Sequence, residues 1–120
     1  IALSSSAANL KAGETATITF TISESVSDFV KEDITVSGGT LGSVAGSGTS
    51  YTVVFTPTAS STANGVISVA DTKFTDAAGN TNADSGDANN TSTITVDTER
   101  PTIALSSSAA NLKAGETATI

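Results

Sequence analysis

Residues 16–23, with the sequence ATITFTIS, alternate apolar and polar side chains with a period of two. Ala16, Ile18, Phe20 and Ile22 fall on one side of this segment, and threonines and a serine fall on the other. Such alternation is typical of an antiparallel β-strand that is buried on one face and solvated on the other. The segment therefore predicts a half-buried sheet rather than an amphipathic helix.

The same alternation recurs along the chain between clusters of glycine, serine, asparagine and aspartate. It predicts about seven strands, at residues 1–6, 15–23, 33–38, 40–46, 50–57, 65–71 and 91–97. Seven short strands in about 100 residues indicate an all-β, immunoglobulin-like β-sandwich. Leu10, Phe29 and Phe74 fall between the predicted strands, and we expect them to close the ends of the core rather than to bind a ligand.

The end of the chain repeats its beginning. Residues 103–120 are identical to residues 1–18, IALSSSAANLKAGETATI. We therefore interpret residues 1–102 as one repeat with a linker at about 97–102, and residues 103–120 as the first strand and the beginning of the second strand of the next identical repeat. Because seven alternating strands start at one pole and end at the other, such repeats would join head to tail into a rod.

Composition and charge exclude several classes of protein. The 120 residues include no cysteine or histidine, which excludes a cysteine nucleophile, a Ser–His triad and the usual zinc sites. The net charge of −7 argues against nucleic acid as a partner, and no apolar run is long enough for direct insertion into a membrane. Paired carboxylates could serve a glycosidase, but nothing in the sequence indicates an aromatic-lined cleft. We expect no enzyme activity.

Most acidic residues lie outside the predicted strands, in three segments: residues 23–33, residues 71–87 and the linker at 96–102. In a seven-stranded sandwich, the first two segments lie at the pole where the first strand starts. The linker of a preceding repeat would arrive at the same pole. A repeat has too few basic residues to neutralise these acids, whereas Ca²⁺ binds six to eight carboxylate, amide and carbonyl oxygens. The alternative interpretation is a set of solvated turns with Asx capping.

The candidate calcium ligands are Glu24, Asp33, Asp76, Asn80 and Asp97. The segment from Asp76 to Asn80, DAAGN, combines an acid, an amide oxygen and a glycine that permits a left-handed bend. Ca²⁺ held by these residues near the junction of two repeats would make the array rigid, and Pro101 would stiffen the linker further.

Four phrases, in this order, resemble a known family: LKAGETATITFTISESVSDF at 10–29, DITVSGGTLG at 33–42, FTDAAGN at 74–80 and VDTERPTI at 96–103. They are similar to the bacterial Ig-like tandem repeats of large, calcium-dependent surface adhesins, many of them RTX proteins exported by type I secretion. The resemblance implies an extracellular extender region that projects a distal adhesive tip from the bacterial surface and serves cell adhesion and biofilm formation. It also implies calcium at and near the interdomain junctions, on the five positions given above.

Two questions stay open at this point. A ligand-binding Ig-like module that recognises a glycan or a surface protein is the alternative to a spacer. Residues 103–120 lack the strands that residues 1–18 would pair with, so they either contact a neighbouring molecule or extend as the start of an incomplete domain. For a spacer and for a ligand-binding module alike, we expect the main partners to be neighbouring identical repeats.

Overall fold

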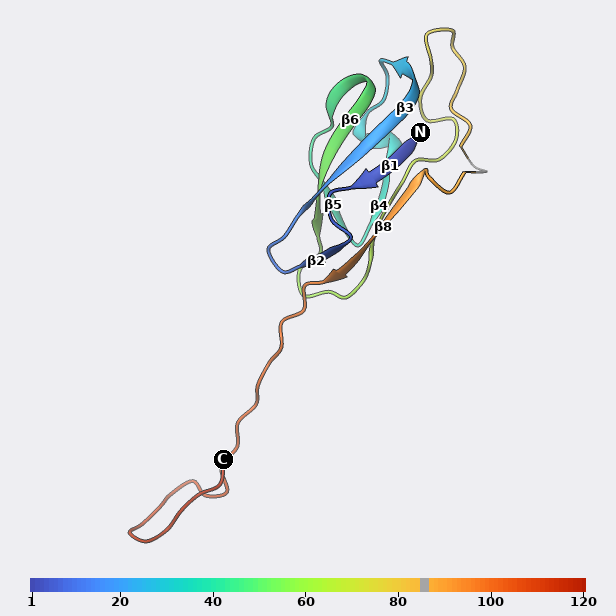
Figure 1. The fold of residues 1–120 in the computed structure, drawn as a ribbon. Helices are drawn as coiled ribbons and strands as arrows, with labels where there is room; N and C mark the ends of the chain where they lie inside the picture. Colours follow the sequence, from blue (N-terminus) through green and yellow to red (C-terminus); the bar gives the residue numbers. More distant parts are fainter. Residues whose placement is uncertain (85–86) are drawn as a thin grey trace.

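The structure is a computed structural model that describes residues 1–84 and 87–120. Its strands are β1 (Ala2–Ser5), β2 (Asn9–Lys11), β3 (Ala16–Val26), β4 (Thr35–Ser37), β5 (Gly39–Leu41), β6 (Ala45–Pro57), β7 (Gly65–Ser68) and β8 (Thr91–Asp97), and η1 (Lys31–Asp33) is one turn of 3₁₀ helix. Figure 1 shows that the strands run roughly along the long axis of one elongated domain.

The strands form two sheets of four, in the order β1-β3-β6-β5 and β2-β8-β7-β4. The alternation in residues 16–23 places Ile18, Phe20 and Ile22 between the sheets, where they are buried, while Thr17 and Thr21 are exposed. Phe55 and Ile67 extend the same core from β6 and β7. The predicted all-β, immunoglobulin-like sandwich is confirmed.

The described residues form eight strands, one more than the number at which the prediction of about seven is centred. Residues 9–11 form β2, which pairs in parallel with β8, with Leu10 opposite Val96. Leu10 is buried, as expected, but it lies in a strand and not in a loop. The first segment of the chain therefore starts in one sheet as β1 and crosses to the other as β2. A three-residue strand carries too short an alternation to be recognised from sequence.

Other predicted strand boundaries also need correction. Residues 40–46 do not form one strand, because β5 ends at Leu41 and β6 begins at Ala45, five residues before the predicted start. Strand β3 continues past residue 23 to Val26, where the register shifts and Val26 pairs with Gly48. Strands β4 and β7 are shorter than predicted. Glycines and serines at the start of β6 hide its strand character, since they are poor strand formers.

Aromatic side chains close the core at one end. Phe29, from the segment after β3, packs against Phe20, Tyr51 and Phe74 with ring centroids 5.3, 5.2 and 5.5 Å apart. The Tyr51 hydroxyl donates a hydrogen bond to the carbonyl of Val26 at 2.9 Å. The expected role of Phe29 and Phe74 as core residues between strands is confirmed. These contacts also hold the 27–34 and 70–84 segments at the same end of the sandwich.

The chain starts at one end of the sandwich and leaves it at the other (Figure 1). We call the end that holds Ile1, Glu24 and residues 74–84 the N-terminal pole. The end that holds Thr98 and the segment between β6 and β7 is the C-terminal pole. The arrangement agrees with the expected head-to-tail direction of the repeat.

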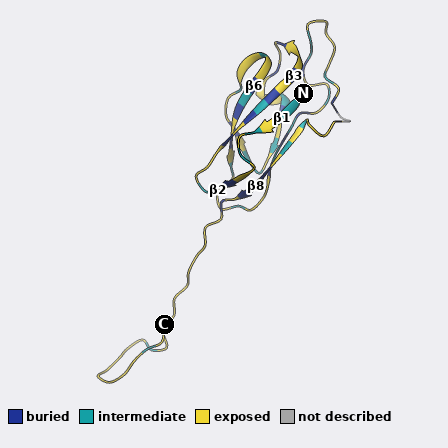
Figure 2. Ribbon diagram, viewed as in Figure 1, coloured by how far each residue is buried: buried dark blue, intermediate teal, exposed yellow. Residues whose placement is uncertain are grey.

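Residues 103–120 lie away from the sandwich (Figure 1), and Figure 2 shows that they are almost entirely exposed. Leu112 is 54% exposed, whereas the equivalent Leu10 is 4% exposed. Even so, residues 103–120 keep local hydrogen bonds that the identical residues 1–18 also form. The amide of Ser108 donates to the Thr119 carbonyl at 3.0 Å, as the Ser6 amide does to Thr17 at 2.9 Å. The 18 residues therefore adopt this local conformation by themselves. The burial of Leu10, in contrast, depends on the rest of the sandwich.

Candidate functional site

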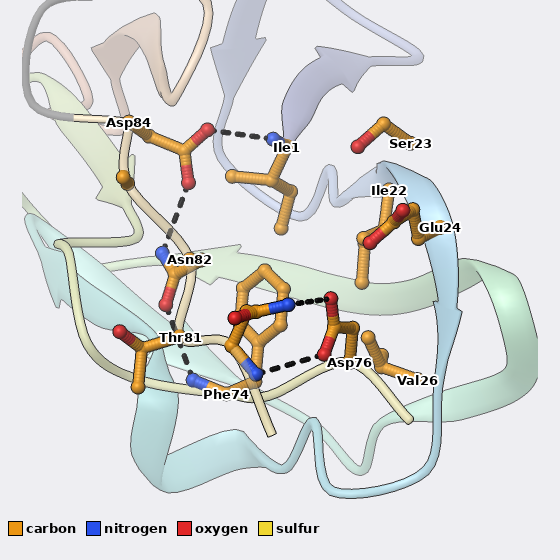
Figure 3. Close-up of a pocket in the computed structure, with 12 residues that line it drawn as sticks. Ile1, Ile22, Ser23, Glu24, Val26, Phe74, Asp76, Thr81, Asn82 and Asp84 are labelled. Atoms are coloured by element: carbon orange, nitrogen blue, oxygen red, sulfur yellow. Dashed lines mark hydrogen bonds and ion pairs between the residues drawn. The ribbon is translucent and has the colours of Figure 1, made fainter. Parts of the chain in front are cut away.

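A cavity of about 380 Å³ opens at the N-terminal pole, between the end of β3 and residues 74–84 (Figure 3). Its lining includes Ile1, Glu24, Asp76, Asn80 and Asp84. The expectation that acids of the 23–33 and 71–87 segments meet where the first strand starts is therefore confirmed. Three of the five candidate ligands, Glu24, Asp76 and Asn80, share this cavity.

Asp76 and Asn80 form the tip of a small hairpin next to β3. Asp76 bridges Val26 at the end of β3, and its amide donates to the Asn80 carbonyl at 3.0 Å. The Asp76 carboxylate accepts hydrogen bonds from the amides of Ala78 and Asn80 at 3.0 and 2.8 Å. Gly79 adopts a φ of +91°, which a residue with a side chain would resist. The predicted bend is therefore present, and the Asp76 carboxylate caps the turn.

The same hydrogen bonds keep the Asp76 carboxylate ionised. Its Oδ2 accepts from the Asn80 side-chain amide at 3.0 Å. This bond and, after it, the Asn80 backbone amide are the main causes that lower the pKa of Asp76. Desolvation opposes them, and the Glu24 side chain and the Ala78 amide make smaller contributions that also lower the pKa. An anion with donors already fixed around it and a second carboxyl group beside it is a suitable position for a cation.

Asn82 and Asp84 organise the other side of the cavity. The Asn82 oxygen accepts from the amides of Lys73 and Phe74 at 2.7 and 3.2 Å, and its nitrogen donates to Asp84 Oδ2 at 2.9 Å. Asp84 is 6% exposed, and its Oδ1 forms an ion pair with the Ile1 ammonium group at 2.8 Å. The Asp71 carboxylate accepts from the Asp84 backbone amide. The sequence does not indicate this contact of Asp84, because only the fold brings Asp84 to Ile1.

Asp28 links the two acidic segments. Its carboxylate accepts from the Thr75 amide at 3.0 and 3.1 Å and from the Thr75 hydroxyl at 2.6 Å. The Thr75 hydroxyl, followed by the Thr75 amide, lowers the pKa of Asp28. Asp28 therefore holds the hairpin that carries Asp76 in place against the segment after β3. In this way it positions one wall of the cavity.

The other two candidate ligands lie elsewhere. Asp33 accepts from the Val30 amide at 2.9 Å through Oδ2, so it caps η1 and does not line the cavity. Asp97 is the last residue of β8 and leads to the C-terminal pole, where its carboxylate accepts from the Glu99 amide at 3.2 Å. In a tandem array, Asp97 of one repeat would precede the N-terminal pole of the next, as the sequence interpretation requires.

The donor atoms of the cavity suit a hard cation, but they are too few within one repeat. Carboxylate oxygens from Glu24 and Asp76 and an amide oxygen from Asn80 are the ligands that Ca²⁺ prefers. Over residues 1–84 and 87–120, the structure gathers no group of three or more acidic side chains that could hold a metal ion. Any cation here needs further oxygens from solvent or from a neighbouring repeat.

Sequence comparison identifies the fold independently. The sequence model that describes the bacterial Ig-like domain matches residues 1–93. A search of curated proteins and a search of solved structures found no match. In the described part of the chain, no helix has the length and apolar character that a membrane span needs.

Proposed function

Because the chain belongs to the bacterial Ig-like domain family, we propose that it is a structural extender repeat of a bacterial surface adhesin, stacked end to end with identical copies. Domains with an Ig-like β-sandwich are typically non-enzymatic, and bacterial ones are commonly extracellular. The proposed array would hold a distal adhesive tip away from the cell.

The path of the chain carries this proposal. The sandwich begins at the N-terminal pole with Ile1, ends at the C-terminal pole with Asp97, and is followed after a short linker by a second copy of its own first residues. The described chain measures 88 × 26 × 19 Å, with residues 103–120 lying away from the sandwich (Figure 1). Each added repeat therefore adds length rather than width.

Calcium is the second part of the proposal. Glu24, Asp76 and Asn80 of one repeat would hold Ca²⁺ together with Asp97 from the linker of the preceding repeat. The ion would supply positive charge between carboxylates that otherwise repel each other, and it would join two domains through one set of ligands. Asp33, which caps η1, remains a prediction with less support, since it lies outside the cavity.

Thermal melting of a two-repeat protein in calcium and in EGTA tests this part. With a dissociation constant of about 10⁻⁴–10⁻³ M, calcium at about 5 mM should stabilise the protein by about 1–2 kcal/mol. Glu24→Gln and Asp76→Asn should each remove most of the increase in Tm, and magnesium should not replace calcium. The matched control is Glu32→Gln, which removes the same charge outside the cavity. Equal melting in calcium and EGTA would contradict the calcium site.

Small-angle X-ray scattering of the same protein tests the spacer role. The expected result is a two-domain particle that becomes longer and more uniform in length when calcium is added. A particle whose maximum dimension is that of a single folded repeat would contradict end-to-end stacking.

No observation favours the alternative of a module that recognises a glycan or a surface protein. Sugar-binding surfaces usually present exposed aromatic rings, and all five aromatic side chains of this chain are buried: Phe20, Phe29, Tyr51, Phe55 and Phe74. A second groove, of about 690 Å³, is lined by Phe29, Val44 and Tyr51 together with glycines and serines.

A further inference from the structure

Two buried polar residues hold the chain where it enters and leaves the domain. Asp84, 6% exposed, binds the Ile1 nitrogen at the N-terminal pole. Thr98, 5% exposed, accepts from the Ser61 amide at 2.9 Å and donates to the Thr58 carbonyl at the C-terminal pole. The Thr98 amide also donates to the Ser61 carbonyl at 2.8 Å. The backbone is therefore fixed on both sides of every repeat.

The repeat changes the chemistry at Asp84. In this chain, the partner of Asp84 is the ammonium group of Ile1. Ile103, the equivalent of Ile1, follows Thr102 through a peptide bond, so its nitrogen is a neutral amide. Asp84 in an array therefore keeps hydrogen-bond donors, such as the Asn82 side chain, but loses its positive partner. A buried carboxylate without a neutralising charge is strongly disfavoured.

We propose that Arg100 of one repeat supplies this positive charge to Asp84 of the following repeat. The proposal rests on the tandem arrangement proposed above, but not on calcium. It assigns to the N-terminal pole a specific partner, the linker arginine of a second copy, and it leaves Glu24, Asp76 and Asn80 free for a metal ion.

Chain geometry brings this arginine to the right place. Arg100 precedes Ile103 by three residues, which span at most about 11 Å when extended. Thr98 fixes the beginning of this short segment, and Pro101 restricts its path. Arg100 is exposed and forms no ion pair with any residue in the described ranges. Arg100 lines a small pocket beside Ala59 and Thr98 at the C-terminal pole, and no ion pair among the described residues holds its guanidinium group there.

The other basic residues of the repeat are less suitable. Lys11 lies in β2, which pairs with the end of β8 away from the cavity. Lys31 lies in η1 and lines a different groove. Lys73 is the main competitor, because its backbone amide binds Asn82 in the same segment as Asp84. Arg100 differs from all three because the covalent chain delivers it to the residue that Asp84 binds.

The test adds the seven residues Val-Asp-Thr-Glu-Arg-Pro-Thr in front of Ile1 of the full chain, and measures thermal melting in EGTA. Replacing the added arginine by glutamine should lower Tm by about 4–8 °C, and lysine should retain part of the effect. In an Asp84→Asn background, the same replacement should change Tm by less than a third of that amount. High salt should reduce the difference.

Two controls keep the result specific. Arg100→Gln in the chain without the extension should leave Tm unchanged, because no Asp84 follows it there. Lys73→Gln should leave the coupling between the added arginine and Asp84 intact. Equal Tm for arginine and glutamine, the same loss in the Asp84→Asn background, or disappearance of the coupling in Lys73→Gln would each overturn the proposal. Because the measurements are made in EGTA, failure of the calcium site would not affect them.

Discussion

Phe29 and Phe74 meet edge to face, with ring centroids 5.5 Å apart and ring planes at 84°. Phe29 follows β3, whereas Phe74 belongs to the long segment between β7 and β8. Their contact therefore joins, through the core, the two segments whose carboxylates line the N-terminal cavity. The geometry of the acidic site depends on this buried aromatic pair as well as on the charges themselves.

Phe29→Ala should destabilise the domain by about 3–5 kcal/mol, because it removes a buried ring and its three aromatic contacts. Urea denaturation followed by circular dichroism measures the change. Val54→Ala is the control, since Val54 is 46% exposed on the outer face of β6 and should change stability by less than about 0.5 kcal/mol. Similar losses for the two variants would contradict the role of Phe29 in the core.

Gly65→Ala should destabilise the domain by about 1–3 kcal/mol through overpacking. A Cβ atom at Gly65 would lie 2.5 Å from Cζ of Phe55, which is fully buried between the sheets. Gly42→Ala provides the matched comparison, because the nearest atom to its added Cβ is the Val54 carbonyl oxygen at 3.8 Å. Equal unfolding midpoints for both variants in urea would contradict the prediction, because they would show that the core accommodates a methyl group at Gly65 without loss of stability.

Asp28→Asn should make the protein less sensitive to acid. The hydrogen bonds from Thr75 lower the pKa of Asp28 below its ordinary value of 3.8 in the folded state. The ionised group therefore contributes stability above that value, and the contribution is lost as pH falls through the lowered pKa. The difference in Tm between neutral pH and about pH 3 should be smaller in Asp28→Asn than in the unmodified chain. Thr75→Val, which removes the hydroxyl that binds Asp28, should reduce that difference in the same direction.

Residues 1–18 and 103–120 should differ in amide hydrogen exchange although their sequences are identical. In the first copy, β1 pairs with β3 and Leu10 is buried, so exchange at residues such as Ser4 requires opening of the sheet. The second copy has only its local hydrogen bonds. Protection should differ by at least about 10²-fold. NMR spectroscopy is the suitable method, because identical peptides cannot be distinguished by mass. Equal protection of Ser4 and Ser106 would show that the second copy has found a partner.

The alternation in residues 16–23, together with the same alternation in residues 50–57 and 91–97, was sufficient to predict the class of fold and most of the buried residues of β3, β6 and β8. The crossing of the first segment between sheets was not predictable, because Leu10 is a single apolar residue whose strand exists only through its pairing with β8. The acidic pole was predictable from loop topology. The structural role of Asp84 was not predictable, since it depends on a contact with Ile1, which lies at the other end of the domain sequence.

The pairing of β2 with β8 also bears on how an array reaches its folded state. Asn9 is one of the first residues of a repeat and its partner Thr95 is one of the last, so the sandwich closes only after nearly the whole unit has been made. Asn111, with the same neighbours as Asn9, follows Thr95 after a short stretch of chain. A nearer segment is found faster, because closing a shorter loop costs less entropy. In the proposed array, β8 would thus have a correct distant partner and an identical nearby competitor. A repeat that completed its own sandwich before the next copy emerged would avoid this competition, so the order in which the chain appears would protect the proposed array from joining neighbours in the wrong register.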